Sequence, residues 1–234
     1  MPTTSGLPTN WSVAGVVGPE KGRSVLSFSN VTDGVTYNLA KFPQTLTPSP
    51  LVGGYTTQTS VNVLARFNGA GAYISGKSAL HKPCNAYFGT LGKETELTSL
   101  VEWKIVFLFW EPVSRSGPAP KTGDMIGAAP GLVISANHGT RFAEIAIGEA
   151  SLISDIKLAA TIIHELAHVA GAPGSTDEAR AKALADRGSA EYKTLIAAEM
   201  ALRHCLLPRQ FNPEALGLLN SHTQGWRSAG RAIS

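Results

Sequence analysis

The chain has 234 residues, of which 43% are hydrophobic and 16% are charged. This ordinary globular composition can bury a core, and it excludes an intrinsically disordered protein. The formal net charge is only +3 and the 20 Lys and Arg residues are scattered, so the sequence lacks the basic stripe of a nucleic-acid-binding protein. No run reaches the roughly 20 apolar residues of a membrane span, and no signal-peptide pattern opens the chain.

The first third of the chain is predicted to be rich in strands. Trp11 and Val13 can join a sheet, and alternating patterns typical of strands occur at Ser24 to Phe28, Val35 to Leu39 and Val61 to Phe67. The segment Phe42 to Gly54 is rich in Pro and Gly, which favours a loop. We therefore place a β-rich N-terminal region at residues 1–76 and a second region at residues 77–234. The first is either a small separate module or a set of strands added to the second.

Both helices and strands are predicted after residue 76, so the fold class is α+β. Two segments are compatible with helix, Ala79 to Ala86 and Thr95 to Val106. Short apolar runs predict strands at Val106 to Trp110, Leu132 to Ile134 and Phe142 to Ile147, with a loop at Ser114 to Asp124. The segment Arg141 to Ile147 is either a strand that pairs with an extended substrate or an ordinary core strand.

A metal-site signature of the form H-E-x-x-H begins at His164. Apolar residues recur around it with helical period, Asp155 suits a helix start, and Gly171 suits a stop. Side chains four residues apart lie above one another on a helix, so His164 and His168 can bind one ion. Glu165 then lies beside the ion, where its carboxylate can take a proton from metal-bound water.

Zinc held by two histidines needs a third protein ligand that leaves one position open. A ligand of the metzincin type would fall on Gly174, which has no side chain, and the nearest Glu for a thermolysin-like arrangement is Glu191. The first carboxylates downstream are Asp177 and Glu178. The segment Ser175 to Glu178 has the S/T-x-x-E form of a capping box, which would occupy Glu178. We therefore favour Asp177, with Glu178 as the alternative.

The remainder of the chain is predicted to be mostly helical. Helices are expected at Thr176 to Arg187, at Ala190 to Leu206 and from Asn212. Cys84 and Cys205 lack the C-x-x-C spacing of a metal or redox site. They can form one disulfide or remain two buried thiols, and we favour the thiols.

The motif and the residues after it resemble the aspzincin metallopeptidases, the deuterolysin and peptidyl-Lys metalloendopeptidase group. The pattern of that group is H-E-x-x-H followed by G-T-x-D-x-x-Y-G. Gly174 and Asp177 match it, and Ser175 replaces its Thr. The Tyr of the family, thought to steady the oxyanion, falls on Arg180, and its final Gly falls on Ala181. A weaker likeness at Asn85 to Thr90 and Ile145 to Ile147 extends the resemblance over roughly residues 80 to 205.

The resemblance implies a zincin-like metallopeptidase fold and three zinc ligands, His164, His168 and Asp177. Glu165 is the implied catalytic base, and Arg180 matches the oxyanion position, with Tyr192 or His204 as alternatives. The implied protein is a zinc-dependent metalloendopeptidase that hydrolyses polypeptide substrates with a Glu-activated, zinc-bound water.

Two other functions compete with this interpretation. The protein can be a zinc hydrolase of a non-protein amide, because the metal chemistry does not identify the acyl group. It can also be a binding module with an impaired catalytic site, since the family Tyr is missing. A metallopeptidase motif without a signal peptide also fits a secreted or delivered effector or toxin that acts outside the producing cell. The sequence leaves the oligomeric state open.

Overall fold

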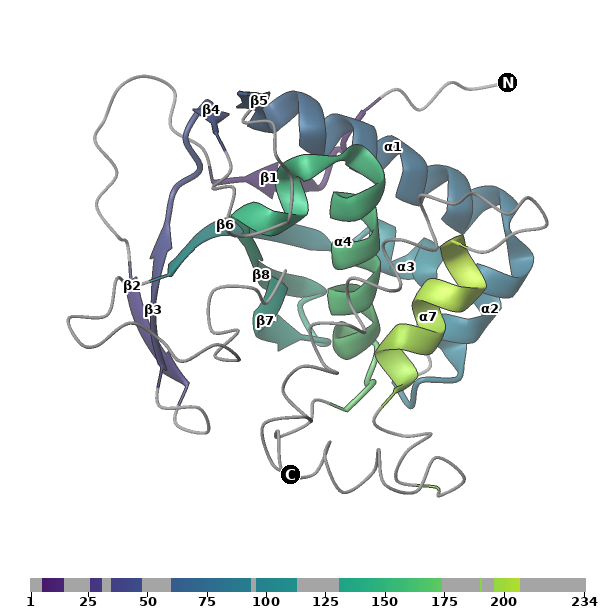
Figure 1. Ribbon diagram of the computed structural model, residues 1–234. Helices are drawn as coiled ribbons and strands as arrows, with labels where there is room; N and C mark the ends of the chain where they lie inside the picture. The colour runs from purple at the N-terminus through teal and green to yellow at the C-terminus, as the bar shows by residue number, and fades with distance from the viewer. Residues whose placement is uncertain are drawn as a thin grey trace, which may run out of the picture.

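The computed structural model describes residues 6–14, 26–30, 35–47, 60–93, 96–112, 131–173, 190 and 196–206. Within these ranges the fold is α+β, as predicted, with helices gathered on one side of a six-stranded sheet (Figure 1). The strands of this sheet are β1 (Trp11–Val13), β2 (Leu26–Asn30), β3 (Val35–Ala40), β6 (Lys104–Pro112), β7 (Gly131–Asn137) and β8 (Phe142–Gly148). Two short strands, β4 (Thr45–Leu46) and β5 (Val61–Asn62), pair separately.

Strand β6 is the centre of the sheet. Strand β8 pairs with it in parallel from Lys104 to Trp110. The other edge of β6 is shared, because β1 pairs in parallel with its first half and β3 pairs antiparallel with its second half. Strands β2 and β7 extend the sheet antiparallel to β3 and β8, which gives the order β2-β3-β6-β8-β7. The strands predicted at these positions are confirmed.

Side chains along β6 point alternately to the face of the sheet that meets the helices and to the opposite face. Ile105, Phe107 and Phe109 are at most 4% exposed and belong to the main core with the helices. Leu108 points the other way and joins a second, smaller cluster with Leu39 and Ala146. This period of two is the expected pattern for a strand buried on both faces.

The strand predicted at Val61 to Phe67 is correct only for its first two residues, which form β5, and wrong beyond them, because helix α1 (Val63–Leu80) begins at Val63. The buried hydrophobic residues of α1 recur at helical spacing and are at most 1% exposed: Val63, Phe67, Ala70 and Ile74. Positions four apart satisfy both a period of two and a helical period, so the short window did not separate the two structures. The Asn62 side chain caps the helix by accepting a hydrogen bond from the amide of Ala65 at 2.9 Å.

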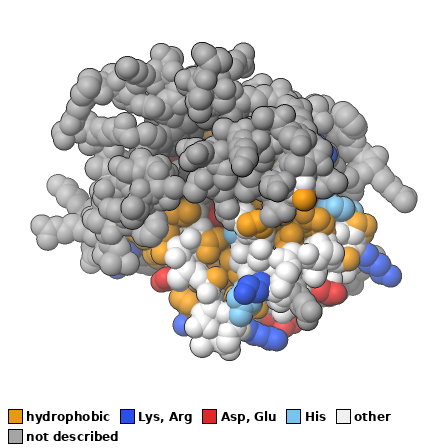
Figure 2. All heavy atoms as spheres, turned by 90° about the horizontal axis from the view of Figure 1, so that it is seen from below, with side chains coloured by type: hydrophobic (Ala, Val, Ile, Leu, Met, Phe, Trp, Pro, Cys, Tyr) orange, Lys and Arg blue, Asp and Glu red, His pale blue; other side chains and the backbone are white. Residues whose placement is uncertain are grey.

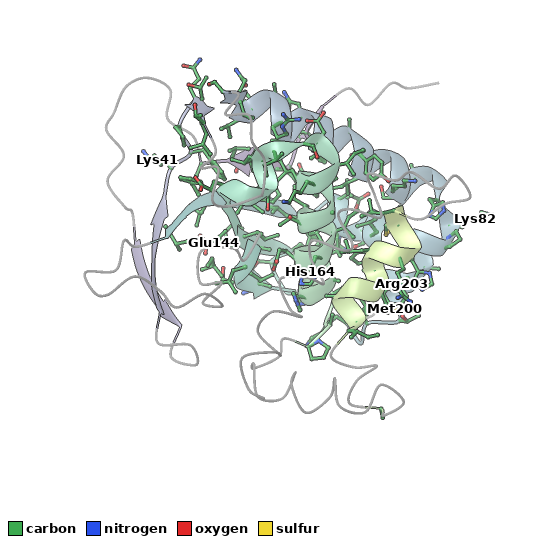
Figure 3. The ribbon with its side chains drawn as sticks, viewed as in Figure 1. Lys41, Lys82, Glu144, His164, Met200 and Arg203 are labelled. Atoms are coloured by element: carbon green, nitrogen blue, oxygen red, sulfur yellow. A yellow bond between two sulfur atoms is a disulfide. The ribbon has the colours of Figure 1, made fainter. Side chains whose placement is uncertain are left out.

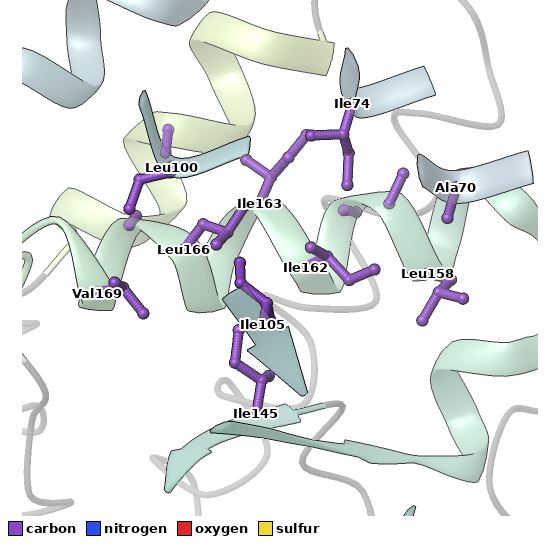
Figure 4. Packing of buried hydrophobic residues seen from close by; sticks show 14 of the residues in the cluster. Ala70, Ile74, Leu100, Ile105, Ile145, Leu158, Ile162, Ile163, Leu166 and Val169 are labelled. Atoms are coloured by element: carbon purple, nitrogen blue, oxygen red, sulfur yellow. The ribbon is translucent and has the colours of Figure 1, made fainter. Parts of the chain in front are cut away.

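Helix α4 (Asp155–Val169) lies between the sheet and the other helices. It contacts β7 and β8 on one side and α1 and α7 (Ala197–Leu206) on the other. Figure 4 shows its apolar side chains between Ile74 of α1 and the pair Ile105 and Ile145 of the sheet. Because α4 is enclosed in this way, its polar side chains lie at defined positions among packed residues.

A disulfide between Cys84 and Cys205 joins helix α2 (Lys82–Gly89) to α7. The prediction of two buried thiols is wrong, because α7 packs against α2 and brings together residues 121 positions apart. The pairing depends on tertiary packing, which cysteine spacing does not reveal. Closing a loop of that length stabilises the folded state by about 4–5 kcal/mol in the chain-entropy model.

The helix predicted at Thr95 to Val106 is correct only in part. Helix α3 (Leu97–Val101) occupies its first half and β6 its second, because the buried pattern changes from helical spacing to alternation. The boundary that we drew after residue 76 falls inside α1, and β1, β2 and β3 share one sheet with β6.

Several predicted elements lie outside the described residues: the loop Ser114 to Asp124, the helix Thr176 to Arg187, the first part of Ala190 to Leu206 and the helix after Asn212. In the part of the chain that is described, no helix is both long and apolar enough to cross a membrane. Figure 2 shows basic, acidic and His side chains interspersed among the described residues of the face seen from below.

Candidate functional site

The predicted motif helix is confirmed as α4, and both of its ends follow from local sequence. At the start, the Ser154 hydroxyl accepts a hydrogen bond from the amide of Lys157 at 3.1 Å. At the end, Gly171 adopts a φ of +111°, a conformation that favours glycine. The three motif residues therefore lie within a well-defined helix, and Figure 3 shows His164 on its lower half.

The side chains of His164 and His168 converge on the same point beside α4. Their Nε2 atoms are 3.1 Å apart, and the two rings meet edge to face at 75°. His164 is only 8% exposed. Helical spacing of four residues produces this convergence, as the sequence predicts.

A backbone carbonyl fixes the orientation of the His168 ring. Its Nδ1 lies 2.9 Å from the carbonyl oxygen of Ala172. A carbonyl can only accept, so Nδ1–H is the donor and, in the neutral ring, Nε2 carries a lone pair. That lone pair is directed toward Nε2 of His164. Ring orientation by a hydrogen bond from the second nitrogen is typical of metal-binding histidines.

The two imidazoles fit a tetrahedral ion. With bonds of 2.0–2.1 Å to each nitrogen, two ligands of such an ion are separated by roughly 3.3 Å, close to the 3.1 Å between the Nε2 atoms. Among the described residues no group of three His, Cys, Asp or Glu side chains could hold a metal. The third ligand expected from the sequence, Asp177, lies outside the described residues.

Glu165, which lies between the two histidines in sequence, is 3% exposed and packs against the first residue of β7. A Cβ built on Gly131 would lie 2.9 Å from both Cγ and Oε1 of Glu165, and 2.8 Å from Cγ2 of Thr161. Both distances are too short for real atoms. The missing side chain of Gly131 therefore provides the space in which the Glu165 carboxylate lies.

A row of buried polar side chains continues along the same side of α4. Thr161 is four residues before Glu165, and its hydroxyl donates to the Lys157 carbonyl at 3.1 Å. The hydroxyls of Ser151 and Thr161 are 2.9 Å apart. Lys157 is 7% exposed, and burial lowers the pKa of its ammonium group. Such a row is costly unless its members are hydrogen-bonded, so it restricts how α4 can sit against the sheet.

The sequence interpretation missed three of these contributors. Thr161 was detectable, because a polar residue four positions before the Glu falls on the same helical face. Gly131 and the carbonyl of Ala172 had no local signal, since their roles depend on how β7 and the turn after α4 pack.

Other residues proposed from the sequence lie outside the described ranges: Asp177, Glu178, Arg180, Glu191 and Tyr192. Of the proposed site residues, the structure thus brings together His164 and His168, and it buries Glu165 on the same helix. His204 lies on α7, where its ring stacks on that of Tyr87 with centroids 4.3 Å apart. The Tyr87 hydroxyl donates to the Ala197 carbonyl at 2.9 Å. His204 therefore takes part in the contact between α2 and α7.

The strand proposed to pair with substrate, Arg141 to Ile147, is an interior strand. As β8 it is hydrogen-bonded to β6 on one side and to β7 on the other. Its backbone groups are occupied, so the alternative of an ordinary core strand is correct. Among the described strands, β7 is the one at this edge of the sheet, and it is also the one that Glu165 contacts.

Comparison with protein-family models, with curated proteins and with solved structures found no match to this chain. The functional interpretation therefore depends on the residues of the site.

We predict an energetic coupling between Gly131 and Glu165. Gly131→Ala should lower the free energy of unfolding by about 1–3 kcal/mol, because the new methyl group overpacks the space beside the carboxylate. In a Glu165→Ala background the cost should fall by about 0.5 kcal/mol or more, because Cγ and Oε1 are gone. Urea denaturation of the four proteins measures both values.

Gly76→Ala is the control, because a Cβ at Gly76 meets nothing within 4 Å. Additive effects of Gly131→Ala and Glu165→Ala, within about 0.3 kcal/mol, would contradict the contact.

Proposed function

We propose that the protein is a zinc-dependent metalloendopeptidase with a zincin-like catalytic domain similar to that of the aspzincins. The observation that carries this proposal is the pair of Nε2 atoms 3.1 Å apart, on a helix that also buries Glu165. Two converging imidazoles and one adjacent carboxylate are the arrangement that the H-E-x-x-H motif supplies for hydrolysis. The hydrogen bond that orients His168 supports a metal-binding role over a packing role.

His164, His168 and Asp177 would hold the ion, with Asp177 supplied by the segment after the α4 turn. Zinc bound there would polarise the scissile carbonyl and lower the pKa of water, which is the chemistry that such sites contribute. Zinc suits this donor set because it accepts both nitrogen and carboxylate oxygen in tetrahedral geometry.

Glu165 would act as the general base and then as the general acid. Its carboxylate accepts the proton of the attacking water and passes it to the nitrogen of the leaving amine. The space above Gly131 favours this role because it accommodates the carboxylate at a defined place on the helix that carries the two imidazoles. Arg180 is our proposed oxyanion stabiliser, with Tyr192 as the alternative, since a guanidinium is always charged and a strong donor.

The position of β7 favours an extended polypeptide as the substrate. Within the described sheet β7 has a neighbour on one side only, and Glu165 lies over its first residue. An extended chain that adds to such an edge is held by main-chain hydrogen bonds, which do not depend on its sequence. A non-protein amide would not use this edge, so the hydrolase of such an amide is our second candidate.

The disulfide supports a place of action outside the producing cell. Disulfides persist in oxidising compartments and are rare where thiols are kept reduced. We therefore propose a secreted or delivered enzyme, with an effector or toxin role as one form of it.

Cleavage assays test both the need for the metal and the role of Glu165 as the base. The protein should cleave an unfolded protein such as casein, a chelator should stop cleavage, and added zinc should restore it. Glu165→Gln should reduce cleavage by about 100-fold to 10,000-fold, because an amide cannot accept the proton, while fold and zinc binding persist. Glu144→Gln is the matched control and should leave cleavage unchanged. Glu144 lies on β8, and its carboxylate accepts a hydrogen bond from the hydroxyl of Ser135 at 2.8 Å. Wild-type turnover in Glu165→Gln would remove the residue from the mechanism.

The second prediction identifies the third ligand. Asp177→Ala should reduce zinc affinity by orders of magnitude, because it removes a ligand. Glu178→Ala should only lower stability by about 1 kcal/mol, because it removes a helix cap. Zinc titration against a competing chelator measures the first effect and urea denaturation the second. If Glu178→Ala strips the metal while Asp177→Ala retains it, Glu178 is the ligand instead.

A further inference from the structure

The C-terminal end of α4 is a Schellman motif, a turn that closes a helix with a left-handed residue. The amide of Ala172 donates to the Ala167 carbonyl at 2.8 Å, and the amide of Gly171 donates to the His168 carbonyl at 3.0 Å. Gly171 supplies the left-handed residue, with a φ of +111°. This pair of bonds is the signature of the motif, and it turns the chain back over the last turn of α4.

The turn brings a backbone carbonyl to the side chain of His168. Ala172 is the residue after Gly171, and its oxygen accepts the Nδ1–H of His168 at 2.9 Å. The motif therefore does more than end the helix. The position of one backbone atom, fixed by the turn, decides where the His168 ring points and which of its nitrogens carries the lone pair.

The loop at residues 91–93 contacts this turn. The amide of Lys93 donates to the Ala170 carbonyl at 3.1 Å. A Cβ on Gly171 would lie 2.3 Å from the carbonyl oxygen of Leu91 and 3.0 Å from Cγ of Lys93. Glycine is thus required at position 171 twice, by its backbone conformation and by the closeness of the loop at residues 91–93.

This loop follows α2, which the disulfide links to α7, and α7 also packs on α4. Figure 1 shows α2 and α7 side by side next to α4. The loop is therefore attached to a covalently closed pair of helices, and its contacts hold the turn in one place relative to α4.

We propose that Gly171 and the loop at residues 91–93 are positioning elements for His168, which set the direction of its Nε2 lone pair before any ion binds. The role in metal binding rests on the proposed function, whereas the role in ring orientation does not. Gly171 acts through His168 and touches neither the ion nor the substrate.

Three glycine variants test the proposal. Gly171→Ala introduces both strain and the contact with Leu91. Gly92→Ala introduces strain alone, since Gly92 has a φ of +99° and open space around its Cβ position. Gly6→Ala is the matched control, because Gly6 has a φ of +135° and its nearest atom, in Asn68, is 3.7 Å away. Each variant is checked for folding by circular dichroism.

Two measurements are made on each protein. Nitrogen-15 NMR of the zinc-free protein reports the tautomer of His168, and competition with a chromophoric chelator gives the zinc affinity. We expect wild type and Gly6→Ala to hold the Nδ1–H tautomer and to bind zinc equally, within about twofold. Gly171→Ala should lose the single tautomer and bind zinc about 10-fold to 100-fold more weakly, the usual effect of disturbing the partner of a ligand. Gly92→Ala should show the same changes to a smaller degree.

A folded Gly171→Ala with the wild-type tautomer and zinc affinity would overturn the proposal. If Gly171→Ala does not fold, unchanged values in Gly92→Ala would overturn it. If the tautomer depends on Gly171 but even wild type binds no zinc, the positioning role stands and the proposed function fails.

Discussion

The hydrogen bond from Nδ1–H of His168 to the Ala172 carbonyl is the contact on which the site depends. Without it the His168 ring could rotate or change tautomer, and its Nε2 lone pair would have no fixed direction. With it, a lone pair points at Nε2 of His164 across 3.1 Å. Two nitrogens held so closely need a proton or a cation between them, since facing lone pairs repel. The helix thus holds two ring nitrogens 3.1 Å apart, an arrangement that a proton or a cation can bridge.

The fold around α4 maintains that geometry from two sides. On the sheet side, Gly131 at the start of β7 leaves the space that Glu165 fills. On the helix side, α7 and α2 are joined by the disulfide, and the loop after α2 contacts the turn beyond α4. The proposed base, Glu165, and one proposed ligand, His168, are therefore positioned by different elements. Glycine is needed at both places. A carboxylate approaches Gly131 and a backbone carbonyl approaches Gly171 so closely that a side chain would clash.

The sequence predicted what depends on local periodicity and missed what depends on packing. The motif helix and the strands at β6, β7 and β8 were readable from spacing, because each pattern extends over enough residues to choose one period. Residues 63–67 were misassigned since Val63 and Phe67 fit both periods, and only Ala70 and Ile74 beyond the window reveal the helix. The disulfide, the interior place of β8 and the roles of Gly131 and Ala172 arise from contacts between distant segments, so no local pattern could contain them. In the site itself, the helical spacing of the motif was sufficient to predict that His164, Glu165 and His168 lie on one helix and that the two imidazoles meet.

The proposed function requires that one zinc ion binds between the two imidazoles of α4. X-ray absorption at the zinc edge can detect this, on protein loaded with one equivalent of zinc and freed of excess. We expect a four-coordinate ion with two imidazole nitrogens at about 2.0–2.1 Å, and a single imidazole after His164→Ala. Zinc that washes away, or a wild-type spectrum without two imidazoles, would show that no such site exists.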